Sequence, residues 1–198
     1  MDSNSIRIMK KVLLTLVMLV VCHSVYAQET ILNDKGAYEK KIVVSVDSTK
    51  AGILYDRAME ALSDWTGASG KAQAGLDYHD RDAGTVIYKG HEYIGFKKVF
   101  LGDGWERYAD FTIKVRCKDG RAQITTTIPT ITFVYNKNGM KRNFTAVEVT
   151  KAVEDAKGKK KERGIALLAD IKELIETITS AMRDRLKNVG CYGDDDDF

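Results

Sequence analysis

The chain has 198 residues, 44% hydrophobic and 30% charged, a composition that fits one globular domain with appendages. Residues 1–27 hold three basic side chains and one acidic side chain, so the rest carries 28 basic and 27 acidic groups, close to +1. A nearly neutral chain gives no electrostatic argument for nucleic-acid binding, so we expect no nucleic-acid partner.

The amino terminus has the pattern of a targeting segment. Lys10 and Lys11 precede the apolar run 12–21, and Val25-Tyr-Ala27 forms a cleavage site. The run is about half of the ~20 residues that a spanning helix needs. We therefore predict a signal peptide over 1–27, export to the periplasm or beyond the cell, and no stable membrane span after cleavage.

Three alternatives concern this segment. Cys22 could serve a lipoprotein signal, although that processing prefers a small residue before the cysteine and Val21 is not small. An uncleaved anchor is a second possibility. Translation could also start at Met9 rather than Met1.

Residues 28–40 are mostly polar and are predicted to be a loose lead-in to a strand at 41–46. Asp47-Ser-Thr49 then offers a helix N-cap. Apolar residues at helical spacing predict a helix that ends near Gly67: Ala51, Leu54, Tyr55, Ala58, Met59, Leu62 and Trp65. Residues 66–80 contain three glycines and are interpreted as a loop.

Extended segments follow at 83–88 and 93–101. We expect Gly90 to interrupt the first, Gly95 to bend the second, and 102–104 to form a turn. The runs 105–117 and 121–135 then form a β-hairpin around Lys118-Asp-Gly120.

Alternation sets the faces of this hairpin. The apolar face is Ala109, Phe111, Ile113 and Val115 on one strand and Ala122, Ile124, Thr126 and Ile128 on the other. Pairing Val115 with Ala122 or with Ile124 keeps these faces. We favour Ile124, because Gly120 can adopt a positive φ in a turn centred on Asp119-Gly120.

Before Pro129 the apolar residues of the strand at 121–135 have even numbers, and after it most have odd numbers. We predict a bulge or a sheet edge there, because proline cannot donate a hydrogen bond to a neighbouring strand. Asn136–Gly139 predicts another hairpin turn, and 142–149 is interpreted as the returning strand. Residues 84–149 are thus expected to form an antiparallel meander.

A last helix is predicted over 163–187. Its apolar stripe is Ile165, Leu168, Ile171, Leu174, Ile175, Ile178, Met182 and Leu186. At about 36 Å it equals a strand of about eleven residues, so it could cover the whole sheet. Residues 188–198 are predicted to be an acidic flexible tail.

Together these elements predict one α+β domain over 41–187. Its fold class is a curved antiparallel β-meander packed on one face by an N-terminal helix and a long C-terminal helix, in a helix-grip-like arrangement.

The order of several segments resembles a known family. They are Ile42–Val46, the helix from Tyr55 to Trp65 and Asp82–Gly90, behind a signal peptide. Over about residues 40–135, the chain resembles the exported bacterial domain-of-unknown-function family 4468. The resemblance implies a TBP-like fold and an exported location. The resemblance implies no reaction and no catalytic residues, and a TBP-like topology does not imply DNA binding.

No catalytic constellation, metal site or cofactor motif is apparent. His79 lies between acidic residues and could act as a base or ligand, but a solvated turn is the favoured interpretation. The mature chain has two histidines and neither HExxH nor CxxC. We therefore expect no metal and no cofactor.

Aromatic side chains near turns are the candidate ligand-binding feature, since such rings often line a groove. The candidates are Tyr78, His79, Tyr93, Trp105 and Tyr108. Trp105 shares parity with Phe111, so its assignment to the core is favoured over one to a groove.

Cleavage leaves two cysteines, Cys117 and Cys191, and export permits a disulfide between them. We favour two free thiols, because Cys191 lies in the tail and tails rarely hold a fixed geometry.

These observations favour a non-catalytic binding module of the cell envelope, with an unknown ligand or envelope protein as partner. A hydrolase built from distant residues is the first alternative, and it requires His79 or His91 to meet a carboxylate or hydroxyl in a cleft. A structural protein that pairs through a sheet edge near Pro129 is the second.

Overall fold

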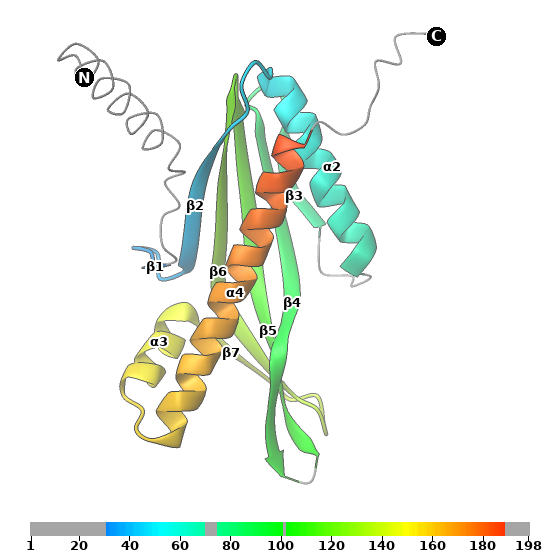
Figure 1. The fold of residues 1–198 in the computed structure, drawn as a ribbon. Helices are drawn as coiled ribbons and strands as arrows, with labels where there is room; N and C mark the ends of the chain where they lie inside the picture. The colour runs from blue at the N-terminus through cyan, green and yellow to red at the C-terminus, as the bar shows by residue number, and fades with distance from the viewer. Residues whose placement is uncertain (1–30, 70–74, 101, 189–198) are drawn as a thin grey trace, which may run out of the picture.

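The computed structural model describes residues 31–69, 75–100 and 102–188. The predicted signal peptide, Cys22 and Cys191 lie outside these residues. One antiparallel sheet of seven strands carries helices on one face (Figure 1), so the predicted α+β class is confirmed. Within the described residues, no helix combines the length and apolar character needed to cross a membrane.

The sheet is built around one central pair of strands. The strands are β1 (Ile31–Leu32), β2 (Tyr38–Ser45), β3 (Gly75–Asp80), β4 (Thr85–Phe100), β5 (Asp103–Lys118), β6 (Arg121–Tyr135) and β7 (Lys141–Thr145). The helices are α2 (Ala51–Ser69), α3 (Ala146–Glu154) and α4 (Lys159–Lys187). Across the sheet the order is β1-β2-β6-β5-β4-β3, and β7 also pairs with β6.

The β5–β6 hairpin has the favoured register, with Val115 opposite Ile124. Gly120 adopts a φ of +74° in the turn, as the Asp-Gly turn requires. Asp119 in the same turn accepts a hydrogen bond from the Ala51 backbone N–H at 2.8 Å. The side chain that accepts from the N-terminus of α2 therefore comes from this distant turn. The predicted N-cap at 47–49 is wrong.

The helix-facing side of the sheet forms the core. All eight predicted apolar-face residues of the hairpin are buried. Helix α4 contributes the buried residues Leu167, Ile171, Ile175, Ile178, Thr179, Met182 and Leu186. Most of the predicted stripe is confirmed, but Ile165 is 54% exposed, since it falls on the outer side of the first turns of α4. Thr179 is accommodated because its hydroxyl pairs with that of Thr126 at 2.9 Å.

Two segments predicted as irregular contain a strand or part of a helix. The lead-in 28–40 contains β1 and the start of β2, whose Tyr38 and Lys40 point inward and are buried. Lys40 forms an ion pair with Glu176 of α4, so a polar sequence still supplies a strand. The predicted loop 66–80 includes the end of α2 and all of β3.

Gly90 does not interrupt the extended segment, since β4 is continuous. A Cβ at Gly90 would lie 2.2 Å from Cζ of Phe111, the residue opposite it. The glycine therefore leaves room for the Phe111 ring in the core.

The predicted strand 142–149 ends at Thr145, where α3 begins. The Thr145 side chain accepts from the Glu148 N–H at 3.2 Å, and the Glu148 carboxylate accepts from the Thr145 N–H at 2.7 Å. This is a capping box. Ala146, Val149 and Val153 are buried at helical spacing, so the pattern Thr-x-x-Glu decided the local structure.

Pro129 occupies a bulge, one of the two predicted alternatives. On one side, β2 ends its pairing at Ile128 and β7 begins at Thr130, so no strand partner faces Pro129 there. On the other side the register with β5 shifts between Asp110 and Thr112. Pro129 therefore lies inside β6 rather than at a sheet edge, and the edge-pairing prediction for this region is not supported by its position.

The predicted equality of helix and strand length is wrong. Helix α4 has 29 residues and spans about 43 Å, whereas β4 and β5 have 16 residues each and span about 53 Å. The β4–β5 hairpin extends away from the first turns of α4 (Figure 1). We call Tyr93–Phe100 of β4 and Asp103–Tyr108 of β5 the arm.

Candidate functional site

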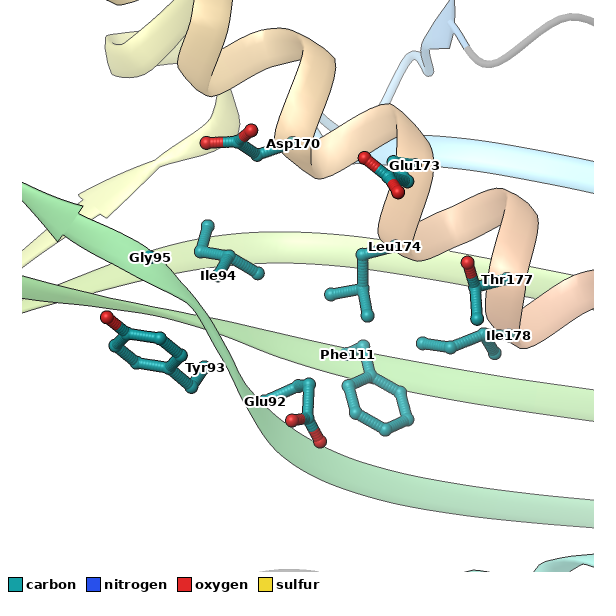
Figure 2. A pocket seen from close by; sticks show the side chains of 10 residues that line it. All are labelled: Glu92, Tyr93, Ile94, Gly95, Phe111, Asp170, Glu173, Leu174, Thr177 and Ile178. Atoms are coloured by element: carbon teal, nitrogen blue, oxygen red, sulfur yellow. The ribbon is translucent and has the colours of Figure 1, made fainter.

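A pocket lies where the arm leaves the helical layer, between β4 and α4. Its volume is about 620 Å³. Figure 2 shows the residues that line it: Glu92, Tyr93, Ile94, Gly95, Phe111, Asp170, Glu173, Leu174, Thr177 and Ile178. The pocket is open to solvent on one side and has a strand wall and a helix wall.

A bulge in β4 forms the strand wall. The register with β5 shifts between Tyr93 and Gly95, as the predicted bend at Gly95 implied. Gly95 has a φ of +125°, a conformation that L side chains rarely adopt. A Cβ there would lie 2.6 Å from Nη2 of Arg107, so the glycine also leaves room for that guanidinium.

Arg107 joins the two walls. Its Nη2 lies 3.1 Å from Oδ2 of Asp170 on α4, and its side chain is 15% exposed. Its Nε is buried without a hydrogen-bond partner among the described residues. This ion pair fixes the helix against the base of the arm and neutralises one of the pocket's three carboxylates.

The lining combines an apolar floor with acidic walls. Phe111 and Ile178 are buried, and Ile94 and Leu174 pack partly against the core. Asp170 and Glu173 project from α4, while Glu92 lies on the strand side beside the Phe111 ring (Figure 2). None of the ten lining residues is Lys, Arg or His. The pocket can therefore hold an apolar group beside a positive charge.

A second cluster lies on the sheet face that the helices leave uncovered. His91 stacks on Tyr108 with 4.8 Å between ring centroids, and Tyr93 meets Tyr108 edge-on at 5.6 Å. His91 Nδ1 lies 2.5 Å from Oδ1 of Asp110. The hydrogen bond from the Tyr108 hydroxyl to Glu106, at 2.7 Å, raises the pKa of Tyr108 to about 12.

This His–Asp pair can orient an imidazole for proton transfer. Asp110 also accepts from the Thr132 hydroxyl at 3.3 Å. Within the described part of the chain, His91 itself has no hydrogen bond to a hydroxyl or thiol. The arrangement thus includes a base and the carboxylate that orients it. Among the described residues it lacks a nucleophilic hydroxyl or thiol hydrogen-bonded to the imidazole.

The five predicted site residues do not form one site. Tyr93 belongs to both the pocket and the uncovered-face cluster, and Tyr108 belongs to the cluster. Trp105 lies on the arm, and its ring centroid is 5.1 Å from that of Tyr135. The Arg142 guanidinium lies 5.2 Å from the centroid of the Trp105 ring. Trp105 is only half-buried, so its assignment to the core is wrong, because α4 does not extend over this part of the strand.

Tyr78 and His79 lie on β3, apart from the arm, and are exposed. The Tyr78 hydroxyl donates to Asp80 at 3.0 Å, which raises the pKa of Tyr78. His79 Nδ1 lies 3.3 Å from the Tyr55 hydroxyl of α2. The favoured turn interpretation of His79 is wrong, since the residue belongs to a strand paired with β4.

Cys117 is buried and free, and burial raises the pKa of its thiol to about 11. Such a thiol is a poor nucleophile at neutral pH. The prediction that Cys117 and Cys191 are not paired stays a prediction, because Cys191 lies outside the described residues. In the described ranges, no group of three His, Cys, Asp or Glu side chains is arranged to hold a metal ion.

Sequence reasoning missed the helix wall of the pocket. Asp170, Glu173 and Thr177 follow one another at i, i+3 and i+7, so they share a flank of α4 beside the buried stripe. That polar flank was visible in the sequence. The strand that it faces was not, because alternation does not show where a helix crosses a sheet.

Residues 41–132 match the family model of the domain of unknown function DUF4468, which is described as having a TBP-like fold. The predicted resemblance to family 4468 is therefore confirmed. No curated protein matches the chain.

Two solved structures are similar to the chain. A DUF4468 family protein from Bacteroides ovatus is 16% identical, with a TM-score of 0.62 over 82% of this chain and 94% of its own. A TBP-like protein from Parabacteroides distasonis is 14% identical, with a TM-score of 0.56 over 80% of this chain and 97% of its own. At these identities the likeness establishes the TBP-like fold alone.

Proposed function

We propose that this chain, which carries the DUF4468 match over residues 41–132, is an exported, non-catalytic binding module that holds a small ligand in the pocket between β4 and α4. The observation that carries the proposal is the pocket itself, with an apolar floor and polar walls. Ligand sites commonly occupy roughly 300–1,000 Å³ and combine an apolar lining with few polar groups. At about 620 Å³ the pocket falls within that range.

The position of the pocket supports a preformed site. Its strand wall is held by a bulge at Gly95 and its helix wall by the Arg107–Asp170 ion pair. The floor is continuous with the buried core through Phe111 and Ile178. A ligand would thus meet walls that are already in place, which lowers the entropic cost of binding.

A helix-surface substitution tests the pocket. Thr177 is exposed and lines the opening, so Thr177→Trp would fill it without disturbing the core. Ala181→Trp, one turn further on the exposed surface of α4, is the matched control. A fragment library screened by ligand-observed NMR should give hits that bind the wild type and Ala181→Trp and are lost on Thr177→Trp. The absence of hits, or hits that persist on Thr177→Trp, would contradict a ligand pocket here.

Export is supported by the basic, apolar and small-residue pattern of residues 1–27. Expression of the full chain in a bacterium, followed by intact-mass and N-terminal analysis, should give a mature chain that begins at Gln28. An unprocessed chain in the cytosol would contradict export, and a lipid-modified Cys22 would replace the predicted cleavage after Ala27.

A hydrolase is the second candidate, and the His91–Asp110 pair is the observation that favours it. Activity on aryl esters that disappears in His91→Ala and is retained in Thr177→Trp would support this candidate. Without a nucleophile on the imidazole, we expect no His91-dependent hydrolysis.

A further inference from the structure

We infer that the ligand of this pocket carries a positively charged nitrogen, an ammonium or a guanidinium, on an apolar stem. The inference rests on the proposed function and names the chemical class of the ligand. Three steps lead to it: the charge of the walls, the ion pair of Arg107 and the nature of the floor.

The charged side chains that line the pocket are all acidic. Glu92 on the strand side and Glu173 on the helix side have no ion pair or hydrogen bond in the part of the chain that the structure describes. Elsewhere on the surface, acidic side chains such as Asp56 and Asp77 pair with Arg81 and Lys89. Two unpaired carboxylates that flank one cavity attract a cation.

The cation that bridges the two walls is already engaged. Arg107 pairs with Asp170 and lies across the Gly95 backbone rather than among the lining residues. It therefore neutralises Asp170 and leaves the charges of Glu92 and Glu173 uncompensated. An anionic ligand would meet both of these carboxylates without a free counter-charge, which is unfavourable.

The floor selects the rest of the ligand. The Phe111 ring and the Leu174 side chain face the cavity between the two acidic residues (Figure 2). A methylene chain that covers these side chains would gain about 0.8 kcal/mol for each buried CH₂. A short alkyl stem with one charged end therefore fits the lining better than a fully polar cation.

Binding of three matched probes tests the class. n-Octylammonium, 1-octanol and octanoate share a stem and differ in charge, and their binding can be measured by ¹H–¹⁵N NMR titration of the wild type and of Thr177→Trp. We expect n-octylammonium to bind the pocket most tightly and octanoate least. Glu173→Gln and Glu92→Gln should each weaken n-octylammonium by about two- to fivefold and leave 1-octanol unchanged. Glu162→Gln, on the exposed first turn of α4, is the charge-matched control and should change neither.

The outcomes separate the inference from the proposed function. If 1-octanol or octanoate binds as tightly as n-octylammonium and Thr177→Trp abolishes that binding, the pocket stands and the cationic class is overturned. If n-octylammonium binds equally to Thr177→Trp, or if none of the three perturbs the pocket resonances while other fragments do, the inference is also overturned. Retained affinity in both Glu→Gln variants would overturn it as well.

The same chemistry could come from three sources, which further titrations distinguish. A lysine-containing peptide blocked at both ends represents a protein side chain, spermidine represents a polyamine, and n-octylammonium represents an amphiphile. The tightest binder identifies the source. A preference for spermidine with no contribution from the stem would contradict the apolar part of the inference.

Discussion

The two halves of β5 have the same alternating pattern and opposite surroundings. In the half from Phe111 to Cys117, the inward residues Ile113 and Val115 are fully buried beneath the helices. In the arm, the inward residue Trp105 is half-buried and packs on Tyr135 and Arg142 of neighbouring strands. The comparison shows that alternation chooses the face of a side chain, while helix cover decides whether that face becomes core.

The pocket lies at the boundary between these two halves. On the covered side its floor is Phe111, and on the arm side its wall is the Gly95 bulge. A strand that leaves the helical layer with a bulge cannot keep its side chains packed against the helix. The cavity therefore lies where β4 diverges from α4, beside the middle of the helix.

The largest expected effect is a difference in stability between a truncation in the covered half and one in the arm. Ile113→Ala removes a fully buried side chain and should lower the free energy of unfolding by about 3 kcal/mol, because it leaves a cavity in a packed core. Val99→Ala truncates an arm side chain that is 57% exposed and should cost less than about 0.5 kcal/mol. Urea denaturation measures both. Equal losses would show that the arm has core-like packing and would break the comparison.

Gly90→Ala should produce the next largest effect. The new Cβ would lie 2.2 Å from Cζ of Phe111, so overpacking should destabilise the protein by about 2 kcal/mol. Phe111→Leu removes that ring and should partly offset the clash. In a double-mutant cycle the pair should therefore couple favourably by about 1 kcal/mol. Additive losses would mean that the ring moves aside freely and that the glycine is not required for packing.

Thr145→Ala tests the junction where the last strand becomes a helix. Loss of the N-cap should destabilise the protein by about 1 kcal/mol at neutral pH. Hydrogen bonds from Thr145 hold the pKa of Glu148 below its ordinary value of 4.5. A carboxyl group whose pKa is lowered on folding stabilises the native state above its unfolded pKa, and this contribution is lost as the pH falls through the folded pKa.

The stability difference between wild type and Thr145→Ala should therefore shrink as the pH falls below 4.5. Denaturation series at several pH values measure this. Thr150→Ala, in the same helix and outside the capping box, serves as the control. A pH-independent difference would show that the Thr145 hydroxyl does not contribute to the lowered pKa of Glu148.

The parts of this fold that the sequence predicted depend on local patterns. The register of Val115 with Ile124 followed from alternation and the Asp-Gly turn, and most of the α4 stripe followed from helical spacing. Helix α3 was not predicted, because the composition around Phe144 is strand-like, although Thr145 and Glu148 have the capping-box spacing.

The pocket could not be predicted in the same way. It depends on where α4 crosses the sheet, and this is set by contacts between residues far apart in the chain, such as Arg107 with Asp170 and Lys40 with Glu176. Of the predicted ligand residues, only Tyr93 lines the pocket. The aromatic residues were recognised from their proximity to turns, while the acidic walls required knowledge of the helix position.

The smallest change in stability is expected at Pro129. On β6, this residue lies between the part of the strand beneath the helices and the part beside the arm. Pro129 is exposed, and no strand partner faces it between the end of β2 and the start of β7. Pro129→Ala adds an N–H group that has no ladder acceptor, so the cost should be about 0.5 kcal/mol, mainly from the greater freedom of the unfolded chain. Hydrogen exchange should find the new amide at 129 unprotected and the amide of Ile131 protected.

Thr127→Pro is the reciprocal variant, because Thr127 pairs with both Glu39 and Thr112. A proline there would remove an N–H from a position that has strand neighbours on both sides and should cost about 3 kcal/mol or more. If the two variants were equally destabilised, Pro129 would be supporting the ladder rather than occupying a gap in it. The bulge would then be a part of the covered half, and the boundary between core and arm would lie beyond it on β6.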